Sequence, residues 1–279
     1  MSQPLSVIIP CKNERAHLAA CVASVHGIAA EIIVADSGST DGSLEIARAL
    51  GCRVVERDYR TYGDFMNWAI PQATHPWVLV LDSDERITPP LAAEIRGALE
   101  QPRQDGYRIL RRNHFLGHAV RFGPWHSDRC LRLFRRDLGR YEGPSDHGAV
   151  QIATGRVGEL SAPMDHYTIS SWEQWIHKLD RYSRVQAAEW HAAGRHPSYW
   201  RLLLTSPLRF LRDYVVRLGF LDGAIGLQIS WSAAFYSFMK QARLWELHHA
   251  RAHREADTAE PTAEPAALTS PAGDRPAAA

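Results

Sequence analysis

The sequence predicts an α/β protein with a mostly parallel sheet flanked by helices and a helical extension after it. Short β-branched runs alternate with helical segments through the first part of the chain, as in parallel sheets with right-handed crossovers. One run, WVLVL at 77–81, is apolar throughout, which is typical of a strand buried on both faces. From Ser171 onward, apolar residues recur at helical spacing.

Composition narrows the class of protein. The chain has 279 residues and a formal net charge of +1, so we expect no nucleic-acid partner. Its four cysteines lack metal-binding spacing, which favours reduced thiols in a cytoplasmic protein. The first residues lack the basic segment of a secretory signal peptide. The uncharged segment from Gly223 to Met239 contains a glutamine and three serines, and it predicts a buried or interfacial helix rather than a transmembrane span.

The first half of the chain reads as strand and helix in turn. Strands are predicted at 5–9, 31–35 and 52–55, and helices at 16–25, 43–50, 64–73 and 89–100. The turn after the first strand carries Pro10, Asn13 and Glu14. A dinucleotide-binding turn needs glycines there, because only glycine lets the backbone approach a pyrophosphate closely. The sequence therefore argues against a classical NAD-binding fold.

Two predicted strands end in acids. Asp36 opens the turn DSGSTDG, where its carboxylate could accept a hydrogen bond from a base N–H or a ribose hydroxyl; a plain polar turn explains it equally well. Asp82 and Asp84 form an Asp-x-Asp (DxD) pair at the carboxyl end of the apolar strand, where open α/β sheets bind ligands. Alternating carboxylates suit a divalent cation held together with a phosphate-bearing ligand.

Four motifs occur in order: Pro10 with Asn13 and Glu14, DSGSTDG from Asp36, Gly63 with Asn67, and DSDE at 82–85. Together they resemble the nucleotide-sugar half of family 2 glycosyltransferases of the GT-A fold. The resemblance is strongest to bacterial lipopolysaccharide core enzymes that add glucose to inner-core heptose. It implies UDP-glucose as donor, Mg²⁺ or Mn²⁺ held by Asp84 and Asp82, and a donor site made of Pro10, Asn13, Glu14, Asp36, Gly63, Asn67 and Asp82.

The resemblance continues after residue 100. A strand is predicted at 106–112, and the following RFGPWHSDRCLRLF at 121–134 carries Arg129 and Arg132 among apolar residues. In that interpretation these arginines face phosphates or the acceptor, because guanidinium groups suit phosphate oxygens. Salt bridges on a solvated strand are the alternative.

An inverting enzyme of this kind also needs a base to take the proton of the acceptor hydroxyl. Relatives show His-Glu at this place, whereas this chain has His147 followed by Gly148. Asp146 is therefore the first candidate base and Glu142 the second, with a turn role as the alternative for either. The resemblance further implies His166 as a third metal ligand; a packed core histidine is the alternative.

The rest of the chain divides by composition. We expect a GT-A domain at 1–170, a helical extension at 171–250 and a disordered tail rich in alanine, proline and acids at 251–279. Between 199 and 218, four arginines stand against the single acid Asp213. This basic amphipathic segment predicts either contact with the anionic inner-membrane surface or packing on the core with its arginines in water.

The sequence therefore predicts a metal-dependent inverting glycosyltransferase. It would move a hexose, glucose by resemblance, from a nucleotide sugar to the lipopolysaccharide core or another envelope glycan or glycolipid. One alternative is a catalytically silent nucleotide-sugar-binding scaffold, which the residue Gly148 leaves open. The other is a metal-dependent sugar nucleotidyltransferase, although such enzymes usually have a glycine-rich basic loop where this chain reads PCKNE.

Overall fold

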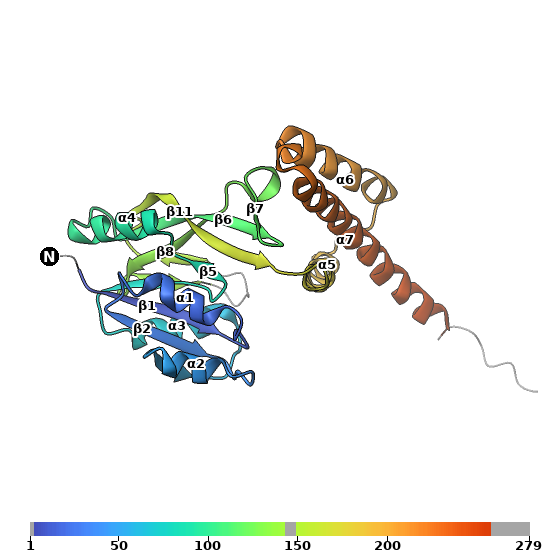
Figure 1. The fold of residues 1–279 in the computed structure, drawn as a ribbon. Helices are drawn as coiled ribbons and strands as arrows, with labels where there is room; N and C mark the ends of the chain where they lie inside the picture. Colours follow the sequence, from blue (N-terminus) through green and yellow to red (C-terminus); the bar gives the residue numbers. More distant parts are fainter. Residues whose placement is uncertain (1–2, 143–148, 258–279) are drawn as a thin grey trace, which may run out of the picture.

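The computed structural model describes residues 3–142 and 149–257. Figure 1 shows a sheet-centred body and a helical extension, which the long strand β11 connects. The strands are β1 (Leu5–Cys11), β2 (Glu31–Asp36), β3 (Arg53–Glu56), β4 (Trp77–Val80), β5 (Glu85–Arg86), β6 (Gly106–Phe115), β7 (His118–Ala119), β8 (Arg129–Arg135), β9 (Gly139–Tyr141), β10 (Val150–Ile152) and β11 (Val157–Ile169). The α-helices are α1 (Leu18–Val25), α2 (Ser43–Ala49), α3 (Tyr62–Ala69), α4 (Pro89–Glu100), α5 (Trp172–Ala192), α6 (Tyr199–Leu211) and α7 (Gly223–Asp257). Four short helical turns are η1 (Ile70–Gln72), η2 (Gly123–Trp125), η3 (Arg212–Val216) and η4 (Gly219–Asp222).

The main sheet has the strand order β3-β2-β1-β4-β8-β6-β11-β5, and β7 pairs with β6. Strands β3, β2, β1 and β4 are parallel, and so are β6 and β11. Strand β8 runs antiparallel to both of its neighbours, so that β6 and β11 share the direction of β4. The predicted α/β fold class, a mostly parallel sheet flanked by helices, is confirmed.

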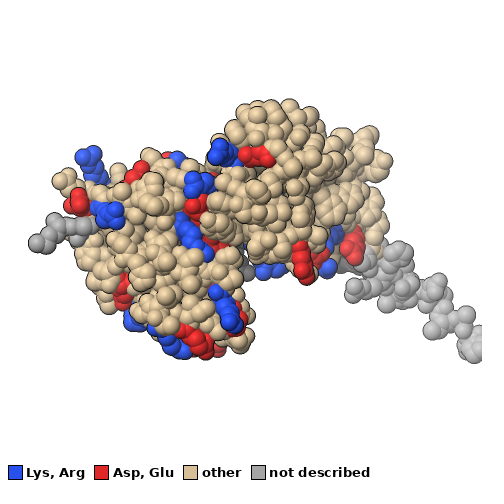
Figure 2. All heavy atoms as spheres, in the orientation of Figure 1, with Lys and Arg blue, Asp and Glu red and all other residues tan. Residues whose placement is uncertain are grey.

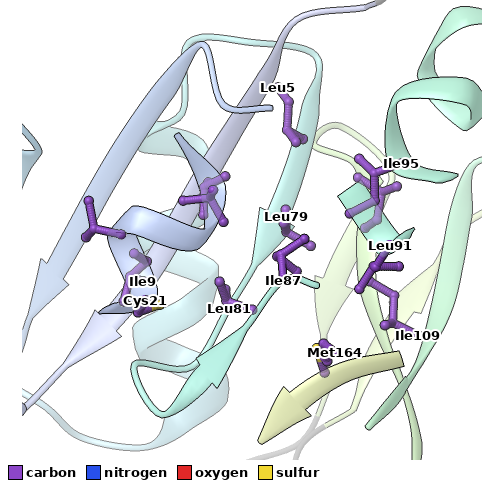
Figure 3. Packing of buried hydrophobic residues seen from close by; sticks show 14 of the residues in the cluster. Leu5, Ile9, Cys21, Leu79, Leu81, Ile87, Leu91, Ile95, Ile109 and Met164 are labelled. Carbon is purple, nitrogen blue, oxygen red and sulfur yellow. The ribbon is translucent and has the colours of Figure 1, made fainter. Parts of the chain in front are cut away.

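Helices cover both faces of the parallel strands. Leu79 of β4 belongs to the cluster under α1 and α4, whereas its neighbours Val78 and Val80 belong to the cluster under α3. Figure 3 shows the first cluster, where Leu79 and Leu81 meet side chains of β1, α1 and α4. Since alternate side chains of a strand point to opposite faces, β4 is buried on both sides. The prediction for this apolar run is confirmed.

Most elements lie within two residues of their predicted bounds, and two differ by more. The helix expected at 64–73 begins at Tyr62, because the Thr61 hydroxyl accepts a hydrogen bond from Asp64 N at 3.3 Å and caps it. It passes into the 3₁₀ turn η1, which contains Pro71, a residue that cannot donate to a continuing helix. The strand expected at 106–112 continues to Phe115 because it pairs with β11 through that residue.

The helical extension leaves the body at the end of β11, and α7 packs against both α5 and α6 (Figure 1). Phe115, Ile169 and Ile229 form a small buried cluster where α7 meets the sheet. Helix α7 continues through Asp257, past the predicted start of the tail, and 258–279 lie outside the described residues. Within the two described stretches, every helix is too short or too polar to cross a membrane.

Candidate active site

Two cavities meet at the carboxyl end of the parallel strands. We name the first, of about 310 Å³, the strand-end cavity, and five predicted site residues line it: Pro10, Glu14, Asp82, Asp84 and His166. The second, of about 590 Å³, is the arginine cavity, which Arg108, Arg111, Arg129 and Arg132 line. Tyr62 and Asp82 belong to the lining of both cavities. A ligand in one cavity therefore adjoins a ligand in the other at these two side chains.

The loops after β1 and β2 form one wall of the strand-end cavity. Lys12 Nζ donates to the carbonyl oxygens of Ser37 and Gly38 at 2.9 and 2.7 Å. Asn13 has a positive φ of 58°, which asparagine tolerates better than most residues, and its Oδ1 accepts from Thr40 N at 2.8 Å. The two loops thus hold one another in place.

Asp36 is fully buried beneath these loops. One of its carboxylate oxygens accepts hydrogen bonds from the backbone N–H groups of Gly38 and Ser39, at 2.7 and 2.8 Å. Asp36 and Asn13 therefore shape the loops, and neither lines the strand-end cavity. Their predicted contacts with the nucleoside stay predictions.

Asp84 and His166 face each other across the strand-end cavity. The antiparallel pairing of β5 with β11 sets His166 opposite Glu85, and His166 Nε2 lies 3.4 Å from Asp84 Oδ2. His166 Nδ1 lies 2.6 Å from Asn113 Oδ1, which can only accept, so this partner holds the ring with Nε2 toward Asp84. A positive charge between Nε2 and the carboxylate, either a proton or a metal ion, suits this geometry.

The carboxylates of this cavity influence one another. Burial raises the pKa of Glu14 above its ordinary value, and the negative charge of Asp84 raises it further. Burial also raises the pKa of Asp84, but the hydrogen bond and charge of His166, together with the charge of Lys178, outweigh burial and lower it. Asp84 is therefore ionised at neutral pH and offers a hard oxygen donor for a divalent cation.

Asp82 is held differently. Arg132 is buried, and its Nη2 donates to Asp82 Oδ2 and also to Glu85 Oε1, the latter at 2.7 Å. The other Glu85 oxygen accepts from Asp82 N at 2.9 Å, and the Tyr62 hydroxyl donates to Asp82 Oδ1 at 3.2 Å. Of the two interpretations of Arg132, ion pairing is the one observed, although in a buried site rather than on a solvated strand.

This network determines how a metal would fit. In the described part of the chain, no three His, Cys, Asp or Glu side chains are arranged to hold a metal ion. The predicted trio of Asp82, Asp84 and His166 is therefore not a preformed cluster. Asp84 and His166 nevertheless offer one oxygen and one nitrogen donor. With ligand oxygens completing the shell, this mixed pair suits Mn²⁺ better than Mg²⁺, which prefers oxygen ligands.

The remaining predicted residues lie elsewhere. Gly63 is buried within α3, and Asn67 exchanges two hydrogen bonds of 2.9 Å with the backbone of Tyr141, which ties α3 to β9. Glu142 is exposed and lines neither cavity. The first candidate base, Asp146, lies with His147 and Gly148 outside the described residues.

The sequence interpretation did not single out Tyr62, Arg108 or Arg111. Tyr62 lies at the start of a helix, and the two arginines lie in an alternating strand, where long polar side chains usually face solvent. Only the pairing of β6 with β8 places both arginines in one cavity with Arg129 and Arg132. No local sequence pattern indicates that these four arginines share one cavity.

The chain belongs to glycosyl transferase family 2, which residues 6–156 match, and so to the class of glycosyl-transferring proteins. It is 29% identical over 263 residues to the lipopolysaccharide core biosynthesis glycosyltransferase LpsC of Rhizobium meliloti (strain 1021), covering 92% of this chain and 97% of LpsC. It is 28% identical to the uncharacterized glycosyltransferase RT0209 of Rickettsia typhi, over 87% of each chain. Glucosyl-3-phosphoglycerate synthase of Mycobacterium tuberculosis, solved with Mn²⁺ and UDP-glucose, superposes with a TM-score of 0.44 at 18% identity, over 70% of this chain and 81% of that one. The predicted family is confirmed.

Proposed function

We propose that this protein is an inverting glycosyltransferase that moves a hexose from a nucleotide sugar to an envelope glycan or glycolipid. The observation that carries the proposal is the strand-end cavity, where Glu14, Asp82, Asp84 and His166 converge in a chain of family 2. Asp84 and His166 would hold a metal ion, and Pro10 and Glu14 would line the donor site. Asp36 and Asn13 position the loops around the nucleoside.

Asp84 and His166 would hold Mg²⁺ or Mn²⁺, and Asp82 would face the donor from its ion pair with Arg132. The bound ion supplies positive charge that offsets the negative charge on the departing diphosphate. Tyr62 and Arg132 keep Asp82 oriented at the junction of the two cavities.

The reaction joins an acceptor hydroxyl to the anomeric carbon of the sugar. The hydroxyl oxygen forms the new bond, the bond between that carbon and the diphosphate oxygen breaks, and a carboxylate takes the hydroxyl proton. Asp146 is our first candidate for this base and Glu142 the second; Glu142 follows β9, which contributes Tyr141 to the arginine cavity. The nucleoside diphosphate leaves with both bonding electrons.

UDP-glucose is the proposed donor, and the lipopolysaccharide core is the proposed acceptor. The name of the Rhizobium meliloti relative, which matches nearly the whole length of both chains, supports this acceptor class. A silent nucleotide-sugar-binding scaffold would bind the same donor without transfer. A sugar nucleotidyltransferase would instead require a sugar phosphate and a nucleoside triphosphate.

Thermal unfolding with nucleotide sugars, with and without Mn²⁺, tests the proposal. We expect UDP-glucose with Mn²⁺ to raise the Tm, because a ligand that binds only the folded state stabilises it by mass action. Asp84→Asn should abolish this increase and the transfer of glucose to isolated core oligosaccharide. Asp137→Asn, a change in an exposed carboxylate on the turn after β8, should leave both intact. Wild-type transfer by Asp84→Asn would refute the proposal, and donor binding without transfer would favour the scaffold.

We also propose that the protein works at a membrane surface, which the helical extension would contact through exposed apolar side chains. Trp200, Leu208, Val216 and Trp231 expose 60 to 72% of their surface. Figure 2 shows that the surface over α6 and α7 on this face has few charged groups, most of them at its edges. Three arginines beside it, Arg209, Arg212 and Arg217, share the single buried partner Asp213, which leaves a net positive charge.

Exposed aromatic and aliphatic side chains flanked by arginines suit the interface of an anionic bilayer. We expect the protein to sediment with vesicles that contain phosphatidylglycerol, less so at high salt, and not with vesicles of phosphatidylcholine alone. The double variant Trp200→Glu/Trp231→Glu should lose this sedimentation while its Tm stays near the wild-type value. Equal sedimentation of wild type and variant would refute membrane contact through this face.

A further inference from the structure

The arginine cavity is built from four guanidinium groups on two neighbouring strands. Arg108 and Arg111 come from β6, and Arg129 and Arg132 from β8. Asp82 is the one acid among the described lining residues. The register between β6 and β8 shifts at Arg132, and such a bulge redirects the side chain of the extra residue. The cavity therefore presents many N–H donors and almost no carboxylate.

The four arginines differ in how far their charge is already neutralised. Arg132 lies between Asp82 and Glu85, and Arg111 Nε lies 2.8 Å from Asp128 Oδ2. These two are structural members of the wall. Even so, the buried Nε of Arg132 has no hydrogen-bond partner among the residues that the structure describes.

Arg108 and Arg129 are less constrained. Arg108 is exposed and has no ion pair within the described residues. Arg129 donates to the carbonyl oxygen of Leu160 at 3.1 Å and lies 3.5 Å from the exposed Glu159, a solvated contact of little strength. Both side chains are therefore available to a ligand, and neither supports the buried core.

We infer that the arginine cavity binds an anionic group of the acceptor, a phosphate or a sugar carboxylate, and so selects acidic glycans. Guanidinium groups bind such oxyanions through paired, charge-assisted hydrogen bonds, which an uncharged sugar cannot match. Arg108 and Arg129 are the specificity-determining residues. The inference rests on the proposed glycosyl transfer, whose acceptor it defines.

Position favours the acceptor over the donor. The strand-end cavity already contains the carboxylates and histidine proposed for the donor and its metal, and the arginine cavity adjoins it at Asp82 and Tyr62. Tyr182 of α5 lines the arginine cavity and also a cavity of about 240 Å³ that Tyr236 of α7 lines. An acceptor would thus extend from the reacting centre toward the helical extension, where a glycolipid would meet the bilayer.

Calorimetric titration of the full-length protein tests the inference with mannose 6-phosphate, glucuronate and mannose as probes. We expect one or both anionic sugars to bind, more weakly as salt is raised, and mannose to give no binding at the same concentration. Arg108→Gln/Arg129→Gln should weaken the anionic probe by at least about tenfold, since each removes charge-assisted hydrogen bonds. Arg135→Gln, which changes a half-exposed arginine of β8 outside the cavity, should bind as wild type does. Whichever anion binds more tightly identifies the acceptor group.

UDP-glucose titrated into the same samples separates this inference from the proposed function. If the protein binds UDP-glucose but binds mannose as tightly as the anionic sugars, the inference is overturned and the proposed function is not. Wild-type affinity of the double variant for the anionic sugars would also overturn the inference. Displacement of UDP-glucose by mannose 6-phosphate would overturn it too, because that result would assign the cavity to the donor. Absence of donor binding in the wild type would refute the proposed function instead. Thermal unfolding of the double variant at the wild-type Tm shows that any loss is not a folding defect.

Discussion

Replacing Arg132 with methionine tests the buried network that orients Asp82. Methionine keeps most of the side-chain volume but removes the guanidinium group from between Asp82 and Glu85. Glu85 has no exposed surface, and its nearest remaining cation is Arg111, whose Nη1 lies 3.6 Å from Glu85 Oε1. The substitution therefore leaves a buried carboxylate without its main partner.

Breaking a buried pair by removing one member costs about 3–5 kcal/mol of unfolding free energy. Because Arg111 still partly neutralises Glu85, we expect Arg132→Met to lower the unfolding free energy by about 3 kcal/mol, measured by urea unfolding at pH 7. Glu85→Gln in the same background removes the unpaired charge, so the double variant should recover about 1–2 kcal/mol relative to Arg132→Met. Donor binding should weaken in both variants, since Asp82 loses the group that orients it.

The matched control is Arg48→Met. Arg48 pairs with Glu56 at 3.3 Å, but both side chains are more than half exposed, so the change should cost less than about 1 kcal/mol. Two results would refute the reasoning: an Arg132→Met protein as stable as the Arg48→Met protein, or additive effects of Arg132→Met and Glu85→Gln. Either would mean that the charge of Glu85 does not depend on Arg132.

Two further stability predictions follow. Burial would raise the pKa of Glu31, but hydrogen bonds from two hydroxyl groups and a backbone N–H lower it to about 2. Because the pKa of Glu31 is lower in the folded state than its value of about 4.5 in the unfolded chain, the ionised carboxylate stabilises the fold at pH values above 4.5. This stabilisation disappears as the pH falls toward 2. Glu31→Gln should therefore cost about 1–2 kcal/mol at pH 7, allowing for solvent screening, and less at pH 3; an equal cost at both pH values would contradict the assignment. A methyl group at Gly226 would overlap the carbonyl oxygen of Gly219, so Gly226→Ala should lower the unfolding free energy by about 1–3 kcal/mol. Gly97→Ala, in open space within α4, should raise the unfolding free energy by up to about 1 kcal/mol. Equal effects of the two changes would contradict the close contact observed between Gly226 of α7 and Gly219 of η4.

Much of the fold was predictable because its signals are local. The run at 77–81 is apolar at every position, as a strand covered on both faces requires. The helix that begins at Pro89 has both a proline at its start and apolar residues at helical spacing. The acids that directly follow β4 are also a local signal, and they indicate the carboxyl end of the parallel strands. Helix bounds near Tyr62 were less predictable, because a single cap hydrogen bond decides them.

The sequence by itself determined the fold class and the family, and it predicted a candidate site at the ends of the strands. Only the tertiary structure decided which side chains meet there. Arg132 contacts Asp82 across 50 positions of the chain, and His166 reaches Asp84 because β11 pairs with β5 in one particular register. Strand register depends on the packing of whole faces, so a one-residue shift would move these side chains to the other face. That dependence on distant packing is why Asp82 was predicted as a metal ligand and is observed in an ion pair.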